Sequence, residues 1–183
     1  YGLREIRVTG GEPTLRQEFA EIMELLSALP LKSLGLTTNG VSLDKHLNQL
    51  RRTALKSINI SLDTLCPVKF RKVTRRDVFA RVYDNILRAK EAGFHVKINA
   101  ILMAGINDCE IDDFVDFSAR HKIEVRFLEL MKIGQANLEG QRRRFLTADD
   151  AINQLLRNHA LTKVPVAKDS TSFVYELSNG ARI

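Results

Sequence analysis

Cysteine and long apolar runs are the scarcest features of this 183-residue sequence. The two cysteines, Cys66 and Cys109, belong to no C-x-x-C pair and have no histidine at metal-ligand spacing. This pattern argues against a disulfide framework or a zinc site and favours the reducing cytoplasm. No stretch approaches the roughly 20 consecutive apolar residues of a membrane-spanning helix, and the first residues do not resemble a signal peptide. We therefore expect a cytoplasmic protein with no membrane partner and no metal-ligating residues.

Tryptophan is absent as well, although the formal net charge is +6. A basic excess suits an anionic partner, either a nucleic acid or a phosphorylated small molecule, and it also fits a solvated basic surface. The Lys and Arg residues are not interleaved with aromatic residues, which weakens the case for stacking on single-stranded nucleic acid. The densest basic run, at 142–144, fits a solvated loop. We therefore expect no nucleic-acid partner.

Two residue patterns alternate along the chain and indicate an α/β fold. Short β-branched runs alternate with stretches in which apolar residues recur at helical spacing. Repeated strand–helix–strand units predict a parallel sheet with right-handed crossovers, either part of a (β/α) barrel or an open doubly wound sheet. The expected strands are Glu5–Val8, Leu34–Thr37, Ser57–Leu62, His95–Leu102 and Glu124–Leu130.

Local signals predict where some helices begin and end. We expect Asp77 to cap one helix and Gly93 to end it, and Thr147 to cap a later helix that ends at Asn158. A last strand-like piece is expected at Ser172–Leu177. The alternation loosens after the fifth strand, so we expect a partial barrel at 1–140 and the start of a C-terminal region at 141–183.

Polar residues alternate with apolar residues inside the expected strands. Arg7, Lys97 and Arg126 each lie between apolar neighbours, as do Asn59 and Asn99. Side chains two residues apart share a face, so one face of the sheet is expected to be apolar and the other polar. A solvated polar face suits an antiparallel sheet better than a parallel one. A barrel lumen that attracts a polyanion, such as a triphosphate, is the interpretation that we favour.

Polar and glycine residues also gather where the expected strands end. Thr9-Gly10-Gly11-Glu12-Pro13 follows the first strand. Active sites of (β/α) barrels lie at this carboxyl end of the strands. Paired glycines let a ligand approach the backbone, and Glu12 offers a carboxylate to an ammonium group. A plain turn would also explain this motif on its own.

Six sequence blocks together resemble radical S-adenosylmethionine (SAM) enzymes, and most closely the GTP 3′,8-cyclase family of molybdenum cofactor biosynthesis. In chain order the blocks are Arg7–Arg16, Thr37–Gly40, Asn59–Asp63, Phe70–Asp77, Gly93–Asn99 and Arg126–Met131. The resemblance runs from Tyr1 to at least Met131. It implies an incomplete (β/α) barrel, here a radical SAM core that lacks its first strand.

The resemblance also implies roles for particular residues. SAM would contact Gly11, Ser61 and Met131, and GTP would contact Arg7, Thr37 and Lys97. The supporting residues would be Gly10, Glu12, Asn59, Asn99 and Arg126. The implied reaction converts GTP to (8S)-3′,8-cyclo-7,8-dihydro-GTP with SAM and two [4Fe-4S] clusters. Cyclic pyranopterin monophosphate synthase would act next, and the parent protein would be a homodimer.

The sequence departs from this family in its cysteines. The family holds one cluster with C-x3-C-x2-C and the second with three further cysteines, and neither set is present. We therefore expect a central fragment that is inactive by itself, because cluster formation needs thiolates. Two alternatives stay open: another radical SAM enzyme with a different substrate, and a non-catalytic nucleotide-binding domain on the same scaffold. A Rossmann dehydrogenase is disfavoured because no G-x-G-x-x-G follows a strand.

Overall fold

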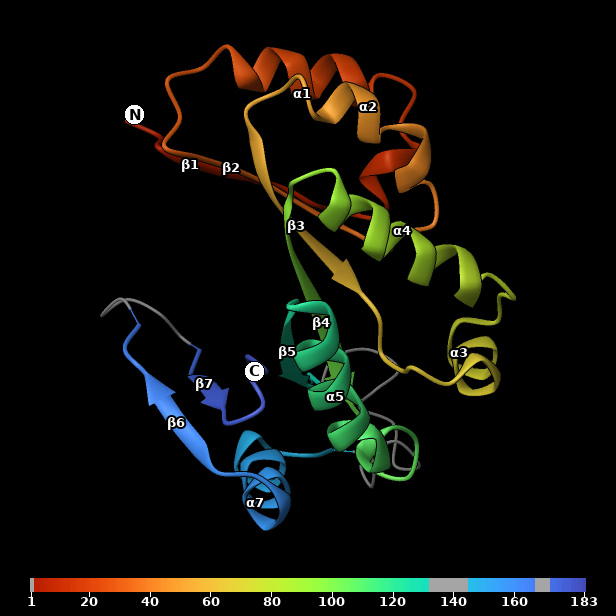
Figure 1. The fold of residues 1–183 in the computed structure, drawn as a ribbon. Coiled ribbons are helices and arrows are strands. Elements are labelled where there is room, and N and C mark those ends of the chain that lie inside the picture. The colour runs from red at the N-terminus through yellow and green to blue at the C-terminus, as the bar shows by residue number, and fades with distance from the viewer. Residues whose placement is uncertain (1, 132–144, 167–171) are drawn as a thin grey trace. The chain divides into compact units, whose positions relative to one another are not determined.

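The computed structural model describes residues 2–131, 145–166 and 172–183 of the chain (Figure 1). The strands described there are β1 (Glu5–Val8), β2 (Ser33–Thr38), β3 (Leu55–Ser61), β4 (His95–Leu102), β5 (Glu124–Glu129), β6 (Leu161–Val164) and β7 (Val174–Leu177). The α-helices are α1 (Phe19–Ser27), α2 (Leu47–Leu50), α3 (Pro67–Thr74), α4 (Phe79–Glu91), α5 (Ile111–His121) and α7 (Ala148–Asn158). Short 3-10 helices are η1 (Pro13–Leu15), η2 (Leu43–Lys45) and η3 (Asp108–Glu110).

The first five strands form one sheet in the order β1-β2-β3-β4-β5. β1 pairs parallel to β2 with Arg7 opposite Gly35, and β2 pairs parallel to β3 with Thr37 opposite Asn59. Strands of the sheet that follow each other in the chain are joined by helical segments. This is the architecture expected for a partial (β/α) barrel, so the predicted fold class and the pairing in chain order are confirmed.

Side-chain alternation along the strands follows the sequence pattern. In β4, the apolar residues Val96, Ile98, Ala100 and Leu102 are buried, and every residue between them is partly exposed. The apolar face of the sheet is thereby removed from water, which is the main favourable term in folding. The side chains of the polar face stay partly exposed, so water or a ligand can contact them.

Helix α4, the second of the two helices between β3 and β4, shows where the local signals succeed and fail. Helix α4 buries Val82, Ile86 and Ala89, and Gly93 follows its end with a φ of +91°, as predicted. Asp77 does not cap it, so that prediction is wrong. Val78 occupies the N-cap position and the helix has no side-chain cap. The apolar pattern extends one residue beyond the helix because Val78 is half-buried without being helical.

Other elements were not predicted from the sequence. Helix α3 and strand β6 lie in segments to which the periodicity assigned no element. Strand β6 pairs antiparallel with β7, which occupies most of the expected strand at Ser172–Leu177.

The chain separates into two compact units. The first contains residues 1–61 and 76–97, and the second contains residues 62–75 and 98–183. In the first unit, α1 and α2 lie on the same side of β1 and β2 (Figure 1). The boundary expected between residues 140 and 141, and the basic run at 142–144, lie outside the described residues. That boundary stays a prediction.

Helix α7 offers a test of local stability. Thr147 Oγ1 accepts a hydrogen bond from Asp150 N at 3.1 Å, and the Asp150 carboxylate accepts one from Thr147 N at 3.0 Å. This reciprocal pair is a capping box, which confirms the predicted N-cap. We expect Thr147→Ala to lower the free energy of unfolding by about 1 kcal/mol in urea titrations. Thr147→Ser keeps the hydroxyl and serves as the control, so equal losses in both variants would contradict the role of the cap.

Candidate functional site

The turn after β1 exposes its backbone. Gly10 has a φ of +127°, a conformation that residues with a side chain rarely adopt. A Cβ atom built at Gly10 or at Gly11 would meet no atom within 4 Å. Neighbouring side chains therefore leave both glycines open, and a ligand could approach the peptide groups closely.

Glu12 joins this turn to the end of β2. Its Oε1 atom accepts hydrogen bonds from Thr14 N at 3.1 Å, Thr14 Oγ1 at 2.6 Å and Thr38 Oγ1 at 2.6 Å. Its Oε2 atom accepts one from Asn39 N at 2.7 Å. The carboxylate thus holds the carboxyl ends of two neighbouring strands together. The contact with an ammonium group stays a prediction.

The polar face of the first unit brings together residues from three strands. Thr37 of β2 lies opposite Asn59 of β3, and Arg7 of β1 lies opposite Gly35. The guanidinium of Arg7 extends over this glycine, because a Cβ atom there would lie 2.9 Å from Arg7 Cζ. Gly35 therefore makes room for the cation.

A buried acceptor without a donor lies on the same face of the first unit, and the second unit contains another. Asn59 is 6% exposed, and its Oδ1 atom has no hydrogen-bond partner among the described residues. In the second unit, the Oδ1 atom of Asn99 is likewise buried and unpaired within the described chain. Such atoms cost free energy unless water or a ligand donates to them. Their place is consistent with the expected supporting roles, which stay predictions.

The remaining predicted site residues lie at different strand positions. Lys97 is partly exposed within β4, and Ser61 is exposed at the end of β3. In the second unit, Met131 is 70% exposed just after β5. Arg126 of β5 donates from Nε to the buried carboxylate of Glu124 at 2.8 Å. The pattern of the sequence did not reveal this partner, since a charge two residues away carries no strong signal.

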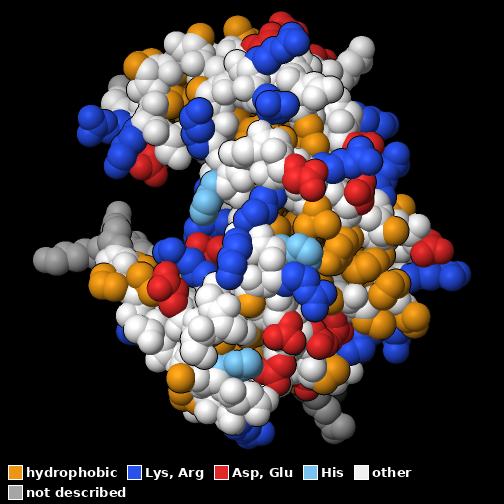
Figure 2. Space-filling model, viewed as in Figure 1, with side chains coloured by type: hydrophobic (Ala, Val, Ile, Leu, Met, Phe, Trp, Pro, Cys, Tyr) orange, Lys and Arg blue, Asp and Glu red, His pale blue; other side chains and the backbone are white. Residues whose placement is uncertain are grey.

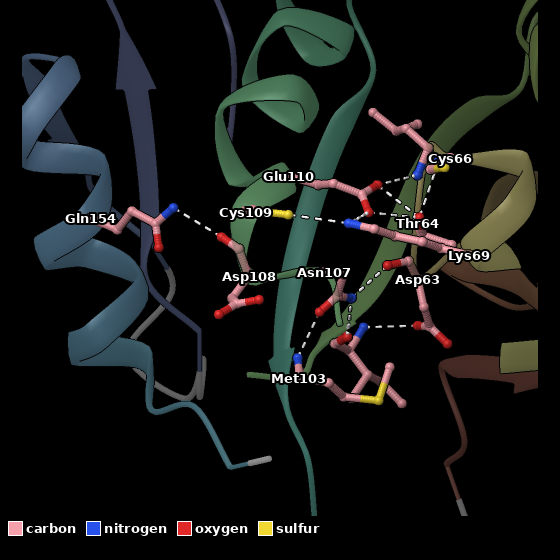
Figure 3. A network of polar contacts seen from close by, with 12 residues as sticks. Asp63, Thr64, Cys66, Lys69, Met103, Asn107, Asp108, Cys109, Glu110 and Gln154 are labelled. Carbon is pink, nitrogen blue, oxygen red and sulfur yellow. Dashed lines mark hydrogen bonds and ion pairs between the residues drawn. The ribbon is translucent and has the colours of Figure 1, made fainter. Parts of the chain in front are cut away.

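The sequence also did not predict a polar network in the second unit (Figure 3). Glu110 is 4% exposed and lies 2.8 Å from the Lys69 ammonium of α3. Its Oε2 atom accepts hydrogen bonds from Thr64 Oγ1 at 2.7 Å and Leu65 N at 2.8 Å. The Lys69 ammonium also lies 3.1 Å from Cys109 Sγ. The network joins the segment after β3 to the segment after β4.

A second set of hydrogen bonds, also drawn in Figure 3, fixes the backbone at the end of β4. Asn107 is fully buried, and its Oδ1 atom accepts from Met103 N at 2.7 Å while its Nδ2 atom donates to Ile101 O at 2.7 Å. Asp63 Oδ1 accepts from Ile101 N at 2.9 Å. Burial raises the pKa of the Asp63 carboxyl above its ordinary value, and the hydrogen bond from Ile101 opposes this effect.

The network around Glu110 predicts a stability loss. Glu110→Ala would leave Thr64 Oγ1 and Leu65 N without their acceptor and Lys69 without its counterion. We expect the free energy of unfolding to fall by about 2–4 kcal/mol, less than for a fully buried pair because one third of Lys69 is exposed. Asp116→Ala, an exposed acid of α5, is the matched control and should change stability by less than about 0.5 kcal/mol. Similar losses in both variants would show that the network contributes nothing specific.

The shifted pKa of Asp63 predicts a dependence on pH. Because the folded carboxyl holds its proton more tightly than the unfolded one, its favourable contribution is present at low pH and is lost as pH rises through the folded pKa. Asp63→Asn retains the acceptor for Ile101 and removes the buried charge. The variant should therefore gain stability over the parent between about pH 4 and pH 7 in urea unfolding. A stability difference that is independent of pH would contradict this account.

The described residues do not provide a metal centre. Among them, no group of three or more His, Cys, Asp or Glu side chains could hold a metal ion. Cys66 and Cys109 are free thiols, and two cysteines cannot supply the three thiolates of an iron–sulfur cluster. The residues of this chain therefore do not fit such a cluster. Within the same residues, no helix has both the length and the apolar character needed to span a bilayer.

Comparison with known proteins extends these observations. The family model described as the Radical SAM superfamily matches residues 1–118. A GTP 3′,8-cyclase from Synechocystis sp. is 39% identical over 182 residues, and the match covers 100% of this chain and 55% of that protein. A GTP 3′,8-cyclase from Aquifex aeolicus is 36% identical over 182 residues, covering 97% and 57%. The chain thus spans somewhat more than half the length of these relatives.

A solved structure supports the same fold. A domain of pyruvate-formate lyase-activating enzyme from Bacteroides vulgatus has a TM-score of 0.67 at 18% identity, and the match covers 84% of this chain and 91% of that domain. This likeness concerns the fold alone. With the family model matching well over half of its residues, the chain belongs to the Radical SAM superfamily.

Proposed function

We propose that this chain is part of an enzyme that converts GTP to (8S)-3′,8-cyclo-7,8-dihydro-GTP, an early step of molybdenum cofactor biosynthesis. The observation that carries the proposal is the polar face of the first unit, on which Arg7, Thr37 and Asn59 come from neighbouring parallel strands. The names of the relatives from Synechocystis and Aquifex support the same activity.

The chemistry of this face suits a nucleoside triphosphate. Arg7 and Lys97 supply positive charge for phosphate oxygens, and the Arg7 guanidinium can donate two parallel hydrogen bonds. The Thr37 hydroxyl can donate or accept, and the unpaired Asn59 oxygen can accept from a ribose hydroxyl or a base amino group. The face therefore offers both the charge and the polar specificity that GTP requires.

SAM would lie against Gly11, Ser61 and Met131 in this proposal. The open backbone at Gly10 and Gly11 and the exposed Ser61 hydroxyl fit a ligand with amino, carboxylate and ribose groups. SAM would supply the radical that abstracts hydrogen from the substrate. This chain's own residues would bind and orient the two ligands. The cluster that such an enzyme needs has no fitting ligand set here, so no step is assigned to it.

Further parts of the proposal concern the parent protein. We infer that it is cytoplasmic and homodimeric, and that cyclic pyranopterin monophosphate synthase uses its product. The main alternative is a radical SAM enzyme with another substrate. Binding selectivity separates the two, because only the first requires the guanine nucleotide to bind better than other nucleoside triphosphates.

Lys97 provides a direct test of nucleotide binding. We expect Lys97→Ala to weaken GTP binding by about 1.5–3 kcal/mol in calorimetry, the scale of a charge-assisted hydrogen bond. Lys56→Ala removes an exposed lysine near the start of β3 and should leave the affinity unchanged. Equal GTP affinity of the parent chain and Lys97→Ala would refute the assignment of Lys97.

A substitution at Gly35 tests whether the observed position of the Arg7 guanidinium matters, because it displaces that group and keeps its charge. A Cβ atom at Gly35 would lie 2.9 Å from Arg7 Nη1 as well as from Cζ, so the end of this flexible side chain must move. We expect Gly35→Ala to weaken GTP binding by about 10-fold while the protein remains folded. Arg7→Ala should weaken it at least as much. Full GTP affinity in folded Gly35→Ala would show that Arg7 does not act from its observed place.

A further inference from the structure

Helix α3 and the loop after β4 enclose a pocket of about 490 Å³ in the second unit. Its lining includes the cations Lys69, Lys72 and Arg75 and the apolar side chains of Val73, Met103 and Ile106. None of these residues has a role in the proposed binding of GTP or SAM. The pocket is therefore a separate feature of the surface that needs its own explanation.

Two lysines of α3 and the arginine that follows it supply the positive charge of this pocket. Lys69 and Lys72 are three residues apart in α3, a spacing that places side chains next to each other. Arg75 follows at the helix end in a left-handed conformation with a φ of +59°. No acidic residue occurs from Pro67 to Arg76. Within the described parts of the chain, Lys72 and Arg75 form no ion pair.

Lys69 is fixed in place by the network of Figure 3. Its ammonium donates to Glu110 Oε1 at 2.8 Å and to Cys109 Sγ at 3.1 Å, and one third of the side chain is exposed. The hydrogen bond to Glu110 raises the pKa of Lys69, so the ammonium stays charged at neutral and alkaline pH. The Glu110 carboxylate is shared with Thr64 and Leu65, so it offsets the cations of the pocket only in part.

The apolar lining indicates more than a bare ion. Val73, Met103 and Ile106 line the pocket and are all half-buried. In Figure 2, orange hydrophobic side chains and blue Lys and Arg side chains lie next to each other over the region of α3. A ligand with an anionic end and a carbon body would use both kinds of surface.

We propose that this pocket binds the phosphate groups of a phosphorylated small molecule. Two lysines of α3 and the arginine that follows it match the several oxygens of a phosphate, and Arg75 can bind two of them with its planar guanidinium. A single-stranded nucleic acid fits less well, because none of the described residues that line the pocket is an aromatic residue that could stack on a base. The phosphates could come from GTP itself or from a different ligand.

Calorimetry with inorganic tripolyphosphate tests the proposal at low ionic strength. We expect Lys72→Ala and Arg75→Asn each to weaken binding by about 5-fold or more. Asn is chosen at position 75 because it tolerates the left-handed conformation. Arg157→Ala, which removes an exposed cation of α7 in the same unit, is the control and should bind as the parent does. Unchanged affinity in both pocket variants would overturn the proposal.

Two further arms identify what is bound. Because Lys97 belongs to the proposed GTP face, the pocket variants are also measured in a Lys97→Ala background. They should lose as much tripolyphosphate affinity there as in the parent chain, and no loss in that background would show that the probe reports the GTP face instead. Titration of GTP into the Lys72→Ala/Arg75→Asn double variant separates the two sources of phosphate. Weaker GTP binding than in the parent chain assigns the pocket to the triphosphate of GTP. Unchanged GTP binding assigns it to another ligand. Displacement of tripolyphosphate by an oligonucleotide, but not by mononucleotides, would overturn the choice of a small molecule.

Discussion

Side chains of a strand alternate between two faces, and the rest of this structure depends on that constraint. Parallel strands joined by helical crossovers must bury apolar residues on the face that the helices cover. Arg7 of β1, Thr37 of β2 and Asn59 of β3 therefore lie on the other face, where the register sets their neighbours. A shift of one residue in any strand would exchange the two faces, so packing of the core also fixes Arg7, Thr37 and Asn59.

Sequence patterns predicted much of the fold because interactions between residues close in the sequence determine where many strands and helices begin and end. The β4 strand, the glycine after α4 and the cap of α7 each depend on residues next to them in the sequence. Helix α3 was missed because its stretch from Pro67 to Thr74 is short and buries one residue, Phe70. Asp77 was misassigned because a good capping residue stood one position away from the true helix start.

The candidate site was predictable in part for the same reason. Strand parity assigned Arg7 and Lys97 to the polar face, whereas Thr37 was named only by the resemblance to a family. The partners of Glu12, Glu110 and Arg126 were beyond such reasoning, since a carboxylate can accept from any donor that the fold brings near. Glu110 and Thr64 are 46 residues apart in the sequence, and nothing local to either residue indicates the other.

Three glutamates with partners differ in their surroundings from two exposed cations of the pocket. Glu12, Glu110 and Glu124 direct their carboxylates toward backbone amides, hydroxyl groups or cations of their own unit. Lys72 and Arg75 instead remain exposed. Within the described residues, the charges of Lys72 and Arg75 are therefore not offset by an ion pair.

The Glu12 carboxylate has a consequence for motion. One side chain holds the turn after β1 and the first residues after β2, so neither segment can open without breaking hydrogen bonds of the other. The two segments should behave as a single cooperative unit in amide hydrogen exchange, with Thr14 and Asn39 exchanging through a common opening event. A loop rich in glycine would ordinarily fluctuate on its own. Here its excursions are tied to those of the neighbouring strand end through the Glu12 carboxylate.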